Sequence, residues 1–230
     1  MNTNAPTFTH ADRKDGIWKT VITLLVIIAV LVAMFVWRVL QPRILSPKEL
    51  YNAGAVVFDT PREISEFTLL NKQGDAFVLD DIKEKWSFVF FGFTHCPDIC
   101  PTTVALFNQL GKEFEQTEWA DSTQFVLVSV DPARDTPEKM QQYVNYFNPD
   151  IRGVTGDFLT IKRLANQLNI AFAKVVTDHE AGEYTVDHSG AVALINADGH
   201  YQGFYKPPLD LEKIALTYQS IRLKDRRDNS

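Results

Sequence analysis

The sequence has very little cysteine, no excess of basic charge and no internal repeat. Its 230 residues contain two cysteines, and 29 acidic residues outnumber 23 lysines and arginines, for a formal net charge of −6. This balance excludes the basic footprint of a nucleic-acid-binding protein. The two cysteines, Cys96 and Cys100, are four residues apart, and a disulfide closing so short a loop would add little stability. The pair is therefore predicted to be reactive or metal-binding and not a structural staple.

Aromatic residues, in contrast, are plentiful. Sixteen Phe, seven Tyr and four Trp need a core in which to be buried, so the chain as a whole is not disordered. The length predicts one medium-sized globular domain with an accessory segment.

One segment near the N-terminus is apolar throughout. Thr20 to Trp37 contains no charge, Gly or Pro, and Trp18 and Arg38 mark its polar or interfacial ends. At about 1.5 Å per residue, this run is just long enough to cross a hydrocarbon core of about 30 Å. A cleavable signal peptide would have a shorter apolar region and a small-residue cleavage site, but Met34 to Arg38 offers none. We expect an uncleaved signal anchor at 17–38, after a short polar tail at 1–16.

The flanking charges leave the orientation of this anchor open. Three basic residues precede the span and three follow it, so the positive-inside rule gives a tie. The tail, interrupted by Asp12 and Asp15, is unlike an Arg-rich, acid-free transit peptide, which favours a bacterial protein.

The remainder alternates between strand-like and helix-like segments after a Pro-containing linker at 39–50. The pattern predicts strands, hairpins and helices at Ile64–Leu70, Ala76–Leu79, Ser87–Phe93, Thr102–Glu115, Phe125–Val130, Thr136–Phe147, Phe158–Leu168, Ala171–Val176, Ala191–Ile195, His200–Phe204 and Leu209–Leu223. Strand–helix alternation that ends in a hairpin and a helix is the order of a thioredoxin-like α/β fold. We expect this domain at 51–223, followed by a charged, frayed tail at 224–230.

The thiols follow a strand that is apolar throughout and precede a helix. The positive end of that helix favours thiolate over thiol, and a spacing of four brings two sulfurs to one face. Such a pair can exchange with disulfides or bind a soft metal. Two sulfurs are too few for a stable zinc site, whereas Cu(I) accepts two or three ligands.

His188 is the best candidate for a third ligand. It precedes the second predicted hairpin, and in a thioredoxin-like fold that loop lies against the cysteine loop. Asp187 either orients the imidazole or is simply a loop carboxylate. The other histidines, His10, His179 and His200, are predicted to be solvated, and the side chain of His95 is expected to diverge from its neighbour Cys96.

Three segments together resemble the Sco/SenC family, copper proteins that help to assemble the CuA centre of cytochrome c oxidase. They are GFTHCPDICP (Gly92–Pro101), SVDPARDTPE (Ser129–Glu138) and VDHSG (Val186–Gly190). The resemblance extends from about Ile64 to the closing helix.

The resemblance implies a copper site made of Cys96, Cys100 and His188. That site would hold Cu(I), would also accept Cu(II), and could instead form a Cys96–Cys100 disulfide. The implied partners are the CuA-bearing oxidase subunit, a copper donor, a thiol reductant and membrane lipid around 17–38. The implied location is the bacterial inner membrane, as a single-pass protein with its domain outside the cytoplasm. Asp131, Arg134 and Asp135 match the family's DPxRDTP segment, and we interpret them as mainly structural, with partner docking as the alternative.

Three other functions use some of the same residues. A thiol–disulfide oxidoreductase would use both cysteines, although such enzymes favour two intervening residues and not three. A peroxidase of the peroxiredoxin type would use Cys100-Pro101-Thr102 and leave Cys96 and His188 without a role. A redox sensor would use the thiol pair without binding copper.

Overall fold

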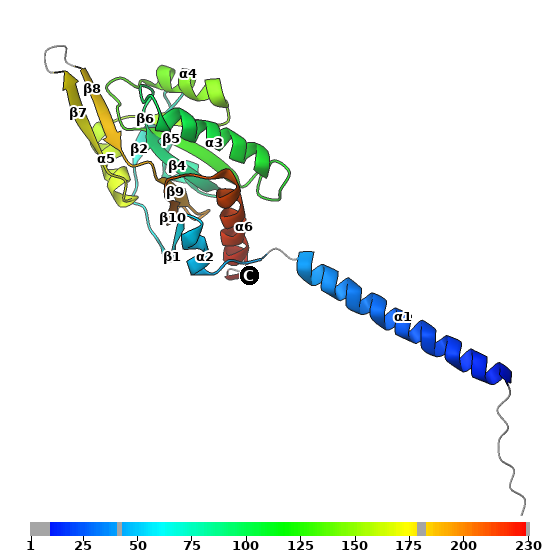
Figure 1. The fold of residues 1–230 in the computed structure, drawn as a ribbon. Helices are drawn as coiled ribbons and strands as arrows, with labels where there is room; N and C mark the ends of the chain where they lie inside the picture. Colours follow the sequence, from blue (N-terminus) through cyan, green and yellow to red (C-terminus); the bar gives the residue numbers. More distant parts are fainter. Residues whose placement is uncertain (1–9, 41–42, 179–182, 229–230) are drawn as a thin grey trace, which may run out of the picture. The chain divides into compact units, whose positions relative to one another are not determined.

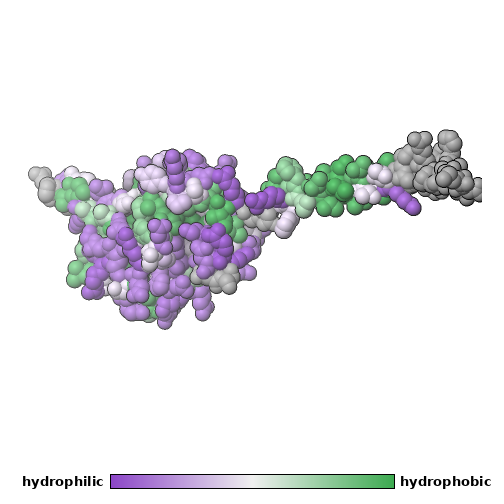
Figure 2. All heavy atoms as spheres, turned by 90° about the horizontal axis from the view of Figure 1, so that it is seen from below, coloured by the Kyte–Doolittle hydropathy of each residue, from purple (hydrophilic) through white to green (hydrophobic). Residues whose placement is uncertain are grey.

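The computed structural model describes residues 10–40, 43–178 and 183–228. It separates into two compact units, Met1–Arg43 and Ile44–Ser230. In the first, α1 (His10–Leu40) includes one stretch, Trp18–Val39, that is long and apolar enough to cross a membrane, and none of it is buried in the protein. Figure 2 shows this stretch as an almost continuous green, apolar surface. The helix also begins earlier than expected, inside the segment predicted to be a polar tail.

The second unit contains an eight-stranded mixed sheet and a separate two-stranded sheet (Figure 1). The main sheet has the order β1-β10-β9-β4-β5-β6-β2-β3, with β4, β5 and β6 parallel to one another. Its strands are β1 (Ala55–Arg62), β2 (Thr68–Asn71), β3 (Ala76–Val78), β4 (Trp86–Gly92), β5 (Thr123–Ser129), β6 (Arg152–Thr155), β9 (Val192–Ile195) and β10 (Tyr201–Tyr205). The second sheet is the antiparallel hairpin β7 (Phe172–Asp178) and β8 (Glu183–His188).

The helices agree with the predicted α/β order. Helix α3 contacts both α4 and α6, and α5 contacts β2. Their bounds are α2 (Pro47–Asn52), α3 (Ile99–Phe114), α4 (Pro137–Phe147), α5 (Phe158–Gln167) and α6 (Leu211–Asp228), with a 3-10 turn η1 at Leu79–Ile82. Thr136 caps α4 with its side chain and Pro137 occupies the first turn, as predicted.

Strand β4 forms the centre of the core, since all seven of its residues are buried. The ring of Phe88 stacks on Phe125 and Tyr205, with centroids 5.3 and 5.7 Å apart, and lies 4.9 Å from the ring of Tyr218. Each such side chain stabilises the fold by roughly 1.5–3 kcal/mol through burial. The rigid carboxyl end of β4 is therefore a well-fixed base for the loop that carries the thiols.

Several local predictions were wrong. The strand expected at Ile64–Leu70 begins only at Thr68. The segment around Pro47 is not a plain linker: Ser46 and Glu49 form a capping box that starts α2. The region from Lys224 to Asp228 is helical and not frayed, because α6 continues through it. The residues before Ser189 form strand β8 and not a loop, so His188 lies at a strand end. Strands β1 and β6 were also not predicted.

Candidate metal centre

The two thiols lie where β4 gives way to α3. The backbone N–H of Cys96 donates to the carbonyl of Phe93 (3.2 Å), which turns the chain sharply after the strand. Helix α3 begins at Ile99, three residues earlier than predicted, so Cys100 lies in its first turn. Cys100 is fully buried, Cys96 is half-buried, and neither forms a disulfide.

Gly92 makes room for the buried sulfur. A Cβ at this position would lie 2.8 Å from Cys100 Sγ and 2.9 Å from the ring of Phe90. Real Cβ atoms essentially never approach other atoms so closely, so only glycine allows the last residue of β4 to pass the thiol without displacing it.

His188 reaches the thiols from the hairpin. It pairs with Phe172 in the β7–β8 ladder, and its ring packs edge-on against Phe90 and Phe93, each with centroids 5.7 Å away. Nδ1 lies 3.2 Å from the carbonyl oxygen of Ser189, and Nε2 lies 3.4 Å from Cys100 Sγ. Because a carbonyl can only accept, the ring proton belongs on Nδ1, which leaves the Nε2 lone pair facing the sulfurs.

The three predicted ligands thus form one cluster. The sulfurs of Cys96 and Cys100 and a ring nitrogen of His188 all lie within 4.8 Å of one another. Asp187 is exposed, and the Nδ1 partner is the Ser189 carbonyl. The structure therefore does not support the orienting role considered for Asp187, which is an exposed carboxylate of β8.

Burial disfavours the charged forms of Cys100 and His188. It raises the pKa of the Cys100 thiol well above its usual range, with a further contribution from the hydrogen bond to Cys96. Burial likewise lowers the pKa of His188. For Cys100, burial therefore opposes the expectation that the helix N-terminus favours a thiolate.

The donor set suits a soft monovalent ion. Two sulfurs and one imidazole nitrogen match the preference of Cu(I), whereas structural Zn²⁺ takes four ligands. The apolar rings of Phe90 and Phe93 against His188 shield the cluster on one side. The residues present therefore fit copper.

The other histidines lie elsewhere. His95 is half exposed, and its Nδ1 lies 3.0 Å from Thr94 Oγ1 and 3.9 Å from Asp135 Oδ1, away from the ligand cluster. His200 lines a surface pocket together with residues of α2, β1 and α6. His179 and the side chain of His10 lie outside the described residues.

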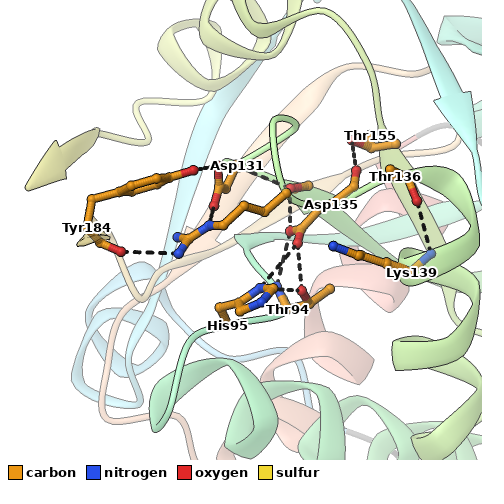
Figure 3. A network of polar contacts seen from close by, with 10 residues as sticks. Thr94, His95, Asp131, Asp135, Thr136, Lys139, Thr155 and Tyr184 are labelled. Carbon is orange, nitrogen blue, oxygen red and sulfur yellow. Dashed lines mark hydrogen bonds and ion pairs between the residues drawn. The ribbon is translucent and has the colours of Figure 1, made fainter. Parts of the chain in front are cut away.

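The DPxRDTP segment carries a polar network beside the site (Figure 3). Arg134 forms an ion pair with Asp131, which agrees with the structural role expected for this segment. The fully buried carboxylate of Asp135 accepts hydrogen bonds from Thr94 Oγ1 (2.6 Å), the Thr94 backbone N–H (3.1 Å) and Ser129 Oγ (2.7 Å). These contacts tie the cysteine loop to β5. The sequence contained the motif, but nothing in it indicated which side chains the motif would meet.

Fold and site together define an α/β thioredoxin-like protein with an N-terminal helix long and apolar enough to span a membrane and a Cys–Cys–His cluster at a strand–helix junction. The model of the SCO1/SenC family matches residues 58–221. A relative from Stutzerimonas stutzeri is 36% identical over 176 residues, which cover 75% of this chain and 83% of the relative. An SCO2-like protein of Rickettsia felis is 31% identical over 187 residues, which cover 80% of this chain and 88% of that protein.

Solved structures agree. The crystal structure of Arabidopsis thaliana ScoI with copper bound is 29% identical, with a TM-score of 0.63 over 69% of this chain and 98% of that one. Bradyrhizobium japonicum ScoI with copper bound is 31% identical, with a TM-score of 0.57 over 69% and 97%. The chain belongs to the SCO1/SenC family.

Proposed function

We propose that this chain is a membrane-tethered copper chaperone that binds Cu(I) through Cys96, Cys100 and His188 and assists assembly of the CuA centre of cytochrome c oxidase. The observation that carries the proposal is the convergence of two thiols and one imidazole nitrogen within 4.8 Å from separate elements of the fold. The copper-bound relatives support the choice of metal.

The chain's own residues prepare the site. The Ser189 carbonyl holds the proton on Nδ1 of His188 and so keeps Nε2 free to ligate. The two thiols must lose their protons when the metal binds, and copper supplies the charge that makes this favourable. Cys96 and His188 are both half-buried, so incoming donors and acceptors can reach these two ligands more readily than the fully buried Cys100.

Anaerobic Cu(I) titration of the full-length protein in detergent tests the ligand set. We expect one Cu(I) per chain, and we expect His188→Ala to weaken binding by more than the roughly 10- to 100-fold that loss of an outer-shell partner costs. His200→Ala is the matched control, because His200 lies in a different pocket, and it should leave the affinity unchanged. Equal affinity in the wild type and His188→Ala would refute the three-ligand site.

We also propose the location and partners. The anchor stays uncleaved in a bacterial inner membrane, and the soluble unit lies outside the cytoplasm, where it receives copper from a donor, is reduced by a thiol reductant and acts on the CuA-bearing subunit. The anchor helix at Trp18–Val39 supports the tether.

A strain without this chain tests the oxidase partner. We expect a large loss of CuA-dependent oxidase activity, restored by the wild-type gene and not by a gene encoding Cys100→Ser. Growth of the deletion strain with added copper provides a further comparison. Excess copper can restore oxidase activity when only copper delivery is lost, but it cannot do so when the oxidase genes themselves are lost. Normal oxidase activity in the deletion strain would contradict the proposed partner.

A thiol–disulfide oxidoreductase remains the second candidate, because the same two sulfurs lie close together and are both reduced. A peroxiredoxin-type peroxidase fits less well. Its attacking cysteine needs an accessible, low-pKa thiolate, whereas Cys100 is fully buried and burial raises its pKa.

A further inference from the structure

One loop contacts both parts of the chain that supply the site. The segment 131–135 joins β5 to α4 and lies between the cysteine loop and the β7–β8 hairpin (Figure 3). The cysteine loop is held by the carboxylate of Asp135, which accepts hydrogen bonds from both the hydroxyl and the backbone N–H of Thr94. Thr94 is two residues from Cys96.

The hairpin is held by the same segment. Nη1 of Arg134 donates to the carbonyl oxygen of Tyr184 (3.2 Å), and the guanidinium carbon lies 3.9 Å from the centre of the Tyr184 ring. The Tyr184 hydroxyl donates to Asp131 Oδ1 (2.9 Å), and Arg134 Nε pairs with the other oxygen of that carboxylate. We refer to Asp131, Arg134 and Tyr184 as the clasp.

The base of the hairpin is also held by Phe172, whose ring packs on Phe158 and whose carbonyl oxygen accepts from Lys162 Nζ, but the rest of the hairpin has few buried side chains. All residues of β7 after Phe172 are exposed, and β8 buries only Val186. An isolated two-stranded sheet is marginally stable in water, so its orientation depends on what anchors it. Figure 1 shows β7 and β8 extending from the main sheet.

The clasp acts on the strand that carries the imidazole. Alternate residues of a strand share a face, so Tyr184, Val186 and His188 point to the same side of β8. Tyr184 is at one end of this face and His188 is at the other. A shift of Tyr184 is therefore transmitted along one short strand to the ring that lies 3.4 Å from Cys100 Sγ.

We propose that Arg134 and Tyr184 are positioning residues that hold His188 against the cysteine pair, so that releasing the clasp converts a three-ligand copper site into a two-cysteine site. The part of this inference that is tested by Cu(I) affinity rests on the proposed function. The charge of Arg134 is balanced by Asp131, and the guanidinium is largely buried, so the contact is stronger than an exposed ion pair.

Hydrogen exchange of the metal-free, full-length protein tests the clasp independently of copper. We expect Arg134→Met to speed amide exchange across 183–188 by at least about 10-fold, because the hairpin then opens more often. Tyr184→Phe keeps the stacked ring and loses only the bond to Asp131, so a smaller increase is expected. Lys174→Met is the matched control. Its ammonium lies 3.6 Å from the same ring but on the hairpin itself, so exchange should not change.

A double-mutant cycle on Cu(I) affinity then tests positioning. We expect Arg134→Met alone to weaken binding by about 10- to 100-fold, as outer-shell changes do. His188→Ala should then cost much less in the Arg134→Met background than in the wild type. With Cu(II), the nitrogen hyperfine couplings of the imidazole should be reduced in Arg134→Met and unchanged in Lys174→Met.

The outcomes separate the two proposals. The positioning proposal would be overturned if Arg134→Met left amide exchange across 183–188 unchanged. It would also be overturned if the fold-losses of Cu(I) affinity in Arg134→Met and His188→Ala simply multiplied in the double mutant. Absence of Cu(I) binding by the wild type would overturn the proposed function, and hydrogen exchange would still decide whether the clasp holds the hairpin.

Discussion

Cys100→Ser is expected to abolish stoichiometric Cu(I) binding. A hydroxyl is a poor ligand for a soft ion, and the variant leaves one sulfur and one imidazole where there were two sulfurs. We expect the affinity to fall at least about 1,000-fold, which corresponds to about 4 kcal/mol. The measurement is competition with a Cu(I) chelator under anaerobic conditions.

The fold of this variant should persist, because serine is close in size to cysteine and its hydroxyl can still bond to His188 Nε2 at the position of Sγ. Thermal unfolding checks this point and separates a lost ligand from a lost fold. Cys96→Ser should show a similar loss of copper with a smaller change in stability, since Cys96 is only half-buried. Wild-type Cu(I) affinity in folded Cys100→Ser would exclude the thiol pair as the binding site.

Gly92→Ala is expected to damage both the fold and the site. The new methyl group would lie 2.8 Å from Cys100 Sγ, 2.9 Å from the Phe90 ring and 3.3 Å from Leu127 Cδ1, inside a core that is already filled. Overpacking of this kind costs about 1–3 kcal/mol. The sulfur is the most movable of these neighbours, so we also expect a weaker Cu(I) affinity.

Gly111→Ala is the matched control, and we expect it to increase the stability of the fold. Gly111 lies in α3, the helix that carries Cys100, and its added Cβ would meet only Phe125, at 3.6 Å. Alanine in a helix is favoured over glycine by about 0.5–1 kcal/mol. Each kcal/mol shifts the melting temperature by about 2–4 °C in a protein of this size. Calorimetry should therefore show a lower melting temperature for Gly92→Ala and a higher one for Gly111→Ala than for the wild type. Equal shifts for the two variants would refute the packing argument.

Local patterns were enough for most of the main sheet and its helices. The apolar run of β4, the Thr136-Pro137 start of α4 and the turn between β9 and β10 each depend on neighbours in sequence, and all three elements formed as predicted. Two strands were missed for different reasons. Strand β1 exists because it pairs with β10, 139–150 residues further along the chain. Strand β8 forms a hairpin with its sequence neighbour β7, and the sequence analysis took it for a loop.

The sequence by itself determined the apolar N-terminal helix and the strand–loop–helix setting of Cys96 and Cys100, because apolar length, periodicity and residue spacing act over a few turns of chain. His188, 88 residues from Cys100, was selected from its expected place in a thioredoxin-like fold and from the family resemblance. Only the tertiary structure decided that the pKa of Cys100 is raised, since the burial that raises it comes from packing against Gly92 of β4 and His188 of the hairpin. It also decided how His188 is held, because the contact between Arg134 and Tyr184 joins residues fifty positions apart that no local pattern connects.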